Sequence, residues 1–172
     1  MADSALHSRL NALSRADAQR ALERCCGSSR WVENMLARRP FASEEALFRD
    51  AEVVWAKLER ADFLEAFSHH PQIGADPAEL AKRFATTAEW SRSEQAGVAR
   101  ADPSTLERLA AGNARYLARF GFVFIVCASG KSAEEMRALL EARLDNAPER
   151  ELSIAAAEQA KITRLRLEKL SA

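Results

Sequence analysis

The feature that most constrains this chain is its supply of helix-forming residues. Of its 172 residues, 35 are alanine and 19 are leucine, whereas valine, isoleucine and threonine together number only 14. Alanine and leucine lose little conformational freedom on entering a helix, and β-branched side chains favour strands. The 6 glycines and 5 prolines supply few helix breakers. These numbers favour an all-α fold over a β-sandwich.

Capping residues and breakers divide the chain into helical stretches. Ser14 and Ser43 each precede a helical pattern, and Ser28 or Ser29 can cap another. Ser132 and Glu135 form a capping box, and Asp102 stands before a proline at the start of a further helix. The pattern predicts about eight packed helices in one domain, residues 1–172, with a short extended segment near residues 122–127. The helical stretches run over residues 15–26, 30–37, 61–68, 78–84, 88–99, 104–120 and 133–144, with a further long helix that starts near residue 43. The last helix opens at a cap on Asn146, with Pro148 in its first turn, and runs to about residue 170.

Charge and hydropathy argue against several classes of function. Lys+Arg and Asp+Glu are both 25, and a formal net charge of zero argues against binding nucleic acid or an anionic membrane through bulk charge. The longest apolar run, residues 122–128, is far too short to cross a bilayer. The first residues lack the pattern of a secretory signal, and three cysteines without disulfide or metal spacing suit a reducing cytoplasm.

Two adjacent histidines, His69 and His70, end a predicted helix just before Pro71. Proline restricts the residue before it, so a histidine here can project from a rigid loop into a cleft. A neutral imidazole near pH 7 is a suitable general acid or base. The simpler interpretation is a histidine that caps the helix carbonyls, and the residues alone favour it.

A polar helix face is the second candidate site. If residues 88–99 are helical, Ser91, Glu94 and Gln95 share one face, because they are spaced by three and four positions. A hydroxyl, a carboxylate and an amide together can recognise a small molecule. The alternative is an ordinary solvated face, and the pattern alone favours that alternative.

Two further features have both a functional and a structural interpretation. An extended segment in a helical protein leaves backbone N–H groups without ladder partners, so residues 122–126 offer them either to a ligand or to side chains and water. Arg166 follows an apolar stripe of the last helix. Its guanidinium can hold a carboxylate, or its stem can cover apolar surface while its head stays in water.

Four motifs in this order resemble the 2-oxo-4-hydroxy-4-carboxy-5-ureidoimidazoline (OHCU) decarboxylase family of urate (purine) degradation. Their sequences are HPQIG at 70–74, SRSEQAG at 91–97, GFVFIVC at 121–127 and KITRLRL at 161–167. The resemblance covers roughly residues 10–170. It implies an all-α lyase that acts without a cofactor, usually as a homodimer, and converts OHCU to (S)-allantoin with loss of CO₂.

Carried over motif by motif, the resemblance implies that His70 and Glu94 are catalytic. It places Arg166 among the substrate-binding residues, with Arg164 as the alternative for that role. The other implied substrate-binding residues are Pro71, Ser91, Gln95, Phe122, Val123, Phe124, Ile125 and Val126. The competing interpretation is a non-catalytic helical protein-interaction module, which would not require these groups to share a cleft.

Overall fold

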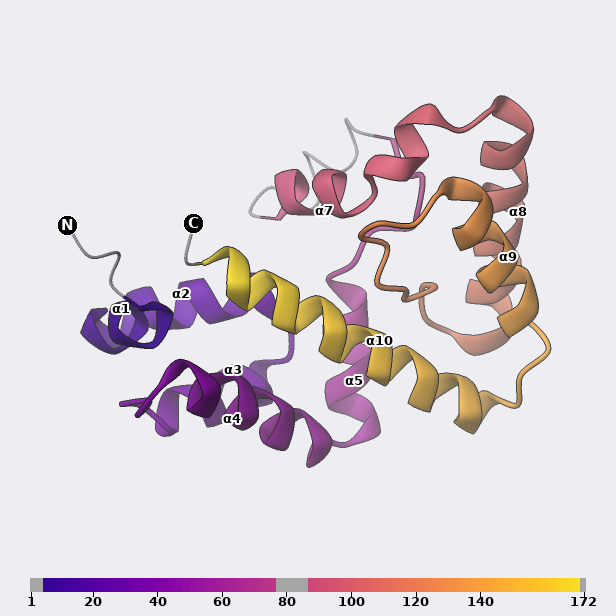
Figure 1. The fold of residues 1–172 in the computed structure, drawn as a ribbon. Helices are drawn as coiled ribbons and strands as arrows, with labels where there is room; N and C mark the ends of the chain where they lie inside the picture. Colours follow the sequence, from indigo (N-terminus) through magenta and orange to yellow (C-terminus); the bar gives the residue numbers. More distant parts are fainter. Residues whose placement is uncertain (1–4, 77–86, 171–172) are drawn as a thin grey trace. The chain divides into compact units, whose positions relative to one another are not determined.

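The computed structural model describes residues 5–76 and 87–170, and every regular element in them is helical (Figure 1). No strand occurs in these two stretches, so the predicted all-α fold class is confirmed. No helix among them is long and apolar enough to cross a membrane. In chain order the elements are α1 (Leu6–Ala12), α2 (Arg15–Cys25), α3 (Ser29–Ala37), α4 (Glu44–Ala56), α5 (Arg60–Ser68), α7 (Ala88–Glu94), the 3₁₀-helix η1 (Ala96–Arg100), α8 (Pro103–Phe120), α9 (Ala133–Arg143) and α10 (Pro148–Lys169).

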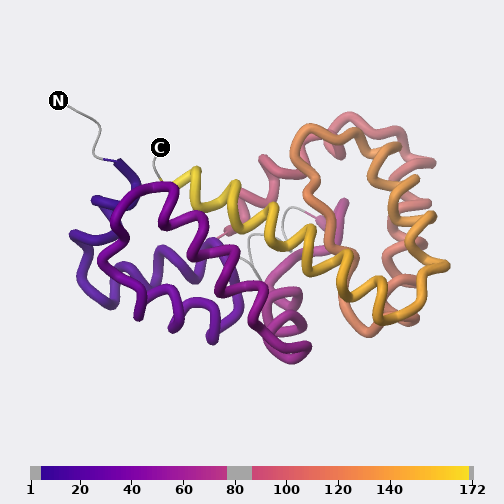
Figure 2. Tube along the Cα trace, turned by 60° about the horizontal axis from the view of Figure 1, so that its bottom comes forward, coloured from indigo at the N-terminus to yellow at the C-terminus, as the bar shows by residue number. Residues whose placement is uncertain are grey.

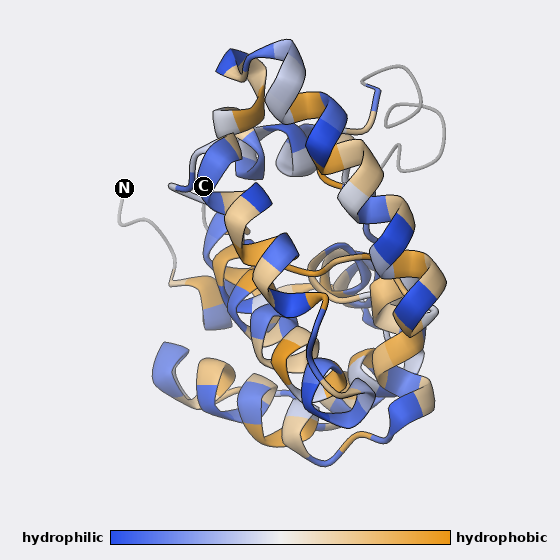
Figure 3. Ribbon diagram, turned by 90° about the vertical axis from the view of Figure 1, so that its right-hand side faces the viewer, coloured by the Kyte–Doolittle hydropathy of each residue, from blue (hydrophilic) through white to orange (hydrophobic). Residues whose placement is uncertain are grey.

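The chain forms two compact units. The first unit contains residues up to Ala66 together with those from Ala160 onwards, and the second unit spans Phe67–Gln159. Both α5 and α10 therefore contribute residues to each unit. Hydrophobic and hydrophilic residues are interspersed along the helices, as expected where one face of each helix is buried (Figure 3).

In the first unit, α2, α3 and α4 begin at capping serines, as predicted. The hydroxyls of Ser14, Ser28 and Ser43 each accept a hydrogen bond from the backbone N–H three residues further on. The core includes the fully buried Trp31, whose indole Nε1 donates to the carbonyl of Ala51 at 3.1 Å. This bond joins α3 to α4 in addition to their apolar packing.

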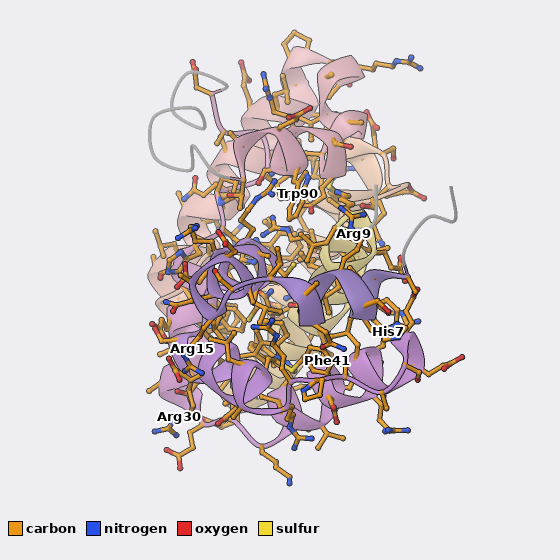
Figure 4. All side chains as sticks on the ribbon, turned by 90° about the vertical axis from the view of Figure 1, so that its left-hand side faces the viewer. His7, Arg9, Arg15, Arg30, Phe41 and Trp90 are labelled. Atoms are coloured by element: carbon orange, nitrogen blue, oxygen red, sulfur yellow. The ribbon has the colours of Figure 1, made fainter. Side chains whose placement is uncertain are left out.

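Helix α1 was not among the predicted helices, because its short sequence offers no capping side chain. The side chain of Asn11, in this helix, instead holds the loop after α3. Its Nδ2 donates to the carbonyl of Phe41 and its Oδ1 accepts the N–H of the same residue, each at 2.9 Å. The ring of Phe41 is buried, whereas the charged head of Arg30 points outwards at the edge of the molecule (Figure 4).

In the second unit, α8 and α9 lie side by side (Figure 2). Asp102 caps α8, and Gly121 ends it with a φ of +79°, which a residue with a side chain rarely adopts. Helix α9 opens with the predicted capping box of Ser132 and Glu135. The two helices approach so closely at Gly112 that a Cβ there would lie 2.1 Å from a methyl carbon of Leu140.

The prediction of one helix over residues 88–99 is wrong. Helix α7 ends at Glu94, Gln95 leaves the helical conformation, and η1 follows. The break allows Gly97 to pack against the turn before α9, where a Cβ would lie 2.2 Å from the carbonyl oxygen of Lys131. The helix predicted over 78–84 lies outside the described residues. The predicted non-helical segment near 122–127 is confirmed, and it forms no strand.

Candidate active site

His70 lies two residues beyond the end of α5. It is half-buried, its neighbour His69 is exposed, and Pro71 behind it is buried. The imidazole Nε2 of His70 lies 2.6 Å from the amide Oε1 of Gln159 in α10. The His70 ring therefore has a buried side-chain partner from a distant part of the sequence.

The loop after His70 is held from two sides. The N–H of Gly74 donates to the Oε1 of Gln95 at 3.0 Å, and the side-chain nitrogen of Asn113 donates to the carbonyl of Ile73 at 2.9 Å. These bonds connect the loop to the end of α7 and to α8. Gln95, which the resemblance places in substrate binding, thus also orients the loop behind His70.

Ser91 and Glu94 both lie on α7, whereas Gln95 lies just beyond its end. Ser91 is 2% exposed, and its hydroxyl has no hydrogen-bond partner within the described part of the chain. A buried hydroxyl without a partner is costly, so its presence here fits a group that bonds a ligand. Glu94, the last residue of the helix, is half-buried.

The charge of Glu94 acts on the end of the segment 122–127. Burial raises the pKa of the Cys127 thiol, and the negative charges of Glu158 and Glu94 raise it further. The N–H of Cys127 donates to the Oε2 of Glu158 at 2.7 Å, and its carbonyl accepts from the Nζ of Lys131 at 2.8 Å. Glu94 and this segment both belong to the second unit, and the end of the segment is held by Glu158 of α10.

The other residues of the segment are mostly buried. The rings of Phe122 and Phe124 pack around Tyr116 in the core, with ring centroids 5.7 and 5.3 Å from that of the tyrosine. Ile125 and Val126 are also buried, and Val123 is half-buried. Since most of these side chains fill the core, the segment can offer a ligand its backbone groups and little else.

A buried polar cluster supports this segment, and no motif of the sequence indicates it. Arg143 donates to the carbonyl of Ile125 at 2.8 Å and to the carboxylate of Glu151 at 2.7 Å. Glu151 is fully buried and also accepts from the hydroxyl of Tyr116 and, at 2.8 Å, from the amide of Asn146. Burial, and next the hydrogen bond to Glu151, raise the pKa of Tyr116 far above its usual range.

Arg166 belongs to the first unit. It is 3% exposed, and its Nη1 donates to the backbone carbonyl of Arg24 at 3.4 Å. The interpretation that its head stays in water is therefore wrong. Arg164 is the solvated residue: it pairs with Glu52 at 3.6 Å and its guanidinium lies 4.3 Å from the ring centroid of Phe48.

Among the predicted site residues of the second unit, hydrogen bonds link the loop of His70 to Gln95 and His70 itself to Gln159 of α10. The neighbouring residue of α10, Glu158, holds the end of the segment 122–127. Participation of Arg166 in the same site stays a prediction. Within the described stretches, no group of three or more His, Cys, Asp or Glu side chains could hold a metal ion.

Gln159 and Glu158 were not singled out from the sequence. They stand immediately before the KITRLRL motif, so extending that motif by three residues towards the N-terminus would have included both. No local pattern reveals their partners, because His70 is 89 residues from Gln159 and Cys127 is 31 residues from Glu158.

Comparisons with known proteins agree with the resemblance seen in the motifs. A family model described as OHCU decarboxylase matches residues 11–168. The "Uric acid degradation bifunctional protein TTL" of Arabidopsis thaliana is 43% identical over 147 residues, which are 85% of this chain and 45% of that protein. The 2-oxo-4-hydroxy-4-carboxy-5-ureidoimidazoline decarboxylase of Amia calva is 44% identical over 89 residues, which are 51% of this chain and 50% of that protein.

A solved structure is also similar over most of its length. The crystal structure of an OHCU decarboxylase in the presence of (S)-allantoin has a TM-score of 0.72 and 42% sequence identity, covering 86% of this chain and 94% of that one. The present chain spans only about half the length of the Arabidopsis and Amia relatives. The match of the family model over nearly the whole chain decides the assignment: this chain belongs to the OHCU decarboxylase family.

Proposed function

We propose that this chain decarboxylates 2-oxo-4-hydroxy-4-carboxy-5-ureidoimidazoline to (S)-allantoin in urate degradation. Two relatives support the proposal, the uric acid degradation protein of Arabidopsis and the OHCU decarboxylase of Amia. The similar crystal structure of an OHCU decarboxylase in the presence of (S)-allantoin supports it as well. The observation that carries it is the grouping of one histidine, one carboxylate and a non-helical backbone segment within a single unit. Helical proteins that serve only as interaction modules have no need of such a grouping.

The chemistry requires no cofactor in this proposal. Loss of CO₂ leaves an electron pair, and the imidazoline ring of the substrate can accept it, so neither pyridoxal phosphate nor a metal is needed. The protein then has to orient the carboxylate, stabilise developing charge and control the face that is protonated.

Each site residue takes a role that its surroundings support. His70 exchanges a proton with the hydroxyl or ring of the substrate, and Glu94 hydrogen-bonds the ring or ureido N–H groups. Arg166, rather than the solvated Arg164, positions an anionic or carbonyl group. The unpartnered hydroxyl of Ser91 and the amide of Gln95 bind polar groups of the substrate. Pro71 and the segment 122–126 are the remaining substrate-binding residues, and the segment binds the substrate through its backbone groups.

The proposal is tested by adding the purified protein to freshly generated OHCU and following both CO₂ release and the optical activity of the allantoin formed. We expect faster decarboxylation and an excess of the S enantiomer relative to a sample without protein. An unchanged rate and a racemic product, with a folded protein, would contradict the proposal and favour the interaction module.

Assembly, location and domain organisation are part of the same proposal. The family resemblance supports a homodimer, measurable by light scattering coupled to size-exclusion chromatography. Three free, buried cysteines support a cytoplasmic location. The unbroken match of one family model over residues 11–168 supports a single functional domain.

A further inference from the structure

The orientation of His70 depends on a residue that none of the four motifs contains. Gln159 is fully buried, and its Oε1 lies 2.6 Å from the Nε2 of His70. In this orientation the amide presents its oxygen to the ring, and an amide oxygen only accepts hydrogen bonds, so the pair forms when Nε2 carries the proton. In a neutral imidazole the other nitrogen, Nδ1, is then the one that can accept a proton.

The part of α10 that carries Gln159 is itself fixed within the second unit. The preceding residue, Glu158, accepts the N–H of Cys127 at 2.7 Å. Two turns earlier, the fully buried Glu151 is paired with Arg143 at 2.5 Å. These contacts fix the turns of α10 that precede Gln159, so the backbone that presents its amide to His70 is held in place.

We infer that Gln159 is a positioning residue for His70. It holds the imidazole in one orientation and in the tautomer protonated at Nε2, so that Nδ1 exchanges the proton with the substrate. The inference rests on the proposed function, in which His70 is the acid–base group, and it assigns Gln159 no contact with the substrate. Such positioning matters because displacing a catalytic group by about 1 Å can cost roughly a hundredfold in rate.

The tautomer can be measured without substrate by ¹⁵N NMR of protein labelled at its histidine ring nitrogens. A His70→Asn variant assigns the His70 signals. At a pH where the ring is neutral, we expect a protonated, pyrrole-type Nε2 and an unprotonated, pyridine-type Nδ1. The opposite pattern would overturn the inference whatever the activity of the protein. The expected pattern in a protein that does not decarboxylate OHCU would instead contradict the proposed function.

Two substitutions at Gln159 separate positioning from general structural support. Gln159→Met keeps a similar volume but removes the acceptor, and we expect kcat to fall by about tenfold to a hundredfold while KM changes less than about threefold. Gln159→Glu keeps an oxygen acceptor, and at a pH where the ring is neutral its ¹⁵N pattern should match that of the wild type.

The matched control is Gln19→Met, which alters a half-buried glutamine of α2 whose amide donates to the exposed carboxylate of Glu23. It should leave kcat and the His70 spectrum unchanged. A normal kcat in folded Gln159→Met would overturn the inference. If Gln159→Met does not fold, the ¹⁵N spectra of the wild type and of Gln159→Glu still test the inference. A His70 tautomer that differs between these two proteins would mean that the native amide donates to His70, and the inference would be overturned.

Discussion

One ion pair from each unit shows two different uses of charged side chains. In the first unit, the guanidinium of Arg164 reaches Glu52 on the surface, and both side chains are about half or more exposed. In the second unit, the side chains of Arg143 and Glu151 are 10% and 0% exposed, and Arg143 also binds the carbonyl of Ile125. Helices satisfy their own backbone groups, whereas a non-helical segment in the core needs partners from elsewhere. A buried ion pair is therefore found where the chain is irregular.

The largest difference should appear when one arginine of each kind is replaced. Arg143→Met leaves the carboxylate of Glu151 buried without its charge partner, and we expect a loss of about 3–5 kcal/mol in the free energy of unfolding. Arg164→Met removes a solvated pair and should cost no more than about 1 kcal/mol. Urea denaturation followed by circular dichroism measures both. Equal losses of unfolding free energy in the two variants would mean that the buried ion pair and the solvated ion pair do not differ.

A second comparison concerns two glutamates of α7. Glu94→Gln keeps the shape of the side chain but removes its charge, and we expect kcat to fall by about a hundredfold with a much smaller change in KM. The control is Glu89→Gln, at an exposed position in the first turn of the same helix, which should leave kinetics unchanged. Steady-state assays on fresh OHCU measure both. Near wild-type turnover for Glu94→Gln would remove this residue from the catalytic groups.

Helix caps should behave alike in the two units, because their bonds are local. Ser43 caps α4 in the first unit and Ser132 caps α9 in the second. Each change to alanine should cost about 1 kcal/mol of unfolding free energy. A loss several times larger for Ser132 alone would mean that its capping box also supports the irregular segment before it. The caps of the two units would then differ as their ion pairs do.

The smallest effect is expected from thiol reagents. Burial raises the pKa of Cys26 to about 12 and also raises that of Cys127, so both thiols stay protonated near pH 8. Because only the thiolate reacts, iodoacetamide should modify neither cysteine in the folded protein on the timescale of a free-thiol control. Mass spectrometry of tryptic peptides measures the modification. Rapid alkylation of Cys127 would show that the end of the segment 122–127 opens readily.

Local signals predicted the fold better than they predicted the site. The caps at Ser14, Ser28, Ser43 and Ser132 lie within three residues of the groups that they bind, so the helix starts follow from sequence. The break after Glu94 could not be foreseen, since it depends on the packing of Gly97 against a turn more than 30 residues away.

The candidate site was predicted only as far as the motifs reach. They named His70, Glu94 and Gln95, whose roles stay predictions. The structure adds that His70 is bonded to Gln159 and that Gln95 accepts the N–H of Gly74. The buried partners of the site stayed hidden. Arg143 and Gln159 lie in ordinary amphipathic helices, where one polar side chain on a buried face looks like any other until its partner is known.

In the proposed reaction His70, and not its neighbour His69, carries out acid–base chemistry on OHCU. The most direct test compares His70→Ala with His69→Ala in the rate and enantiomeric excess of allantoin formation. We expect His70→Ala to lose about a hundredfold or more in kcat, whereas His69→Ala, altered at an exposed ring, keeps nearly full activity and S selectivity. Equal losses in two folded variants, or no loss in His70→Ala, would contradict the account.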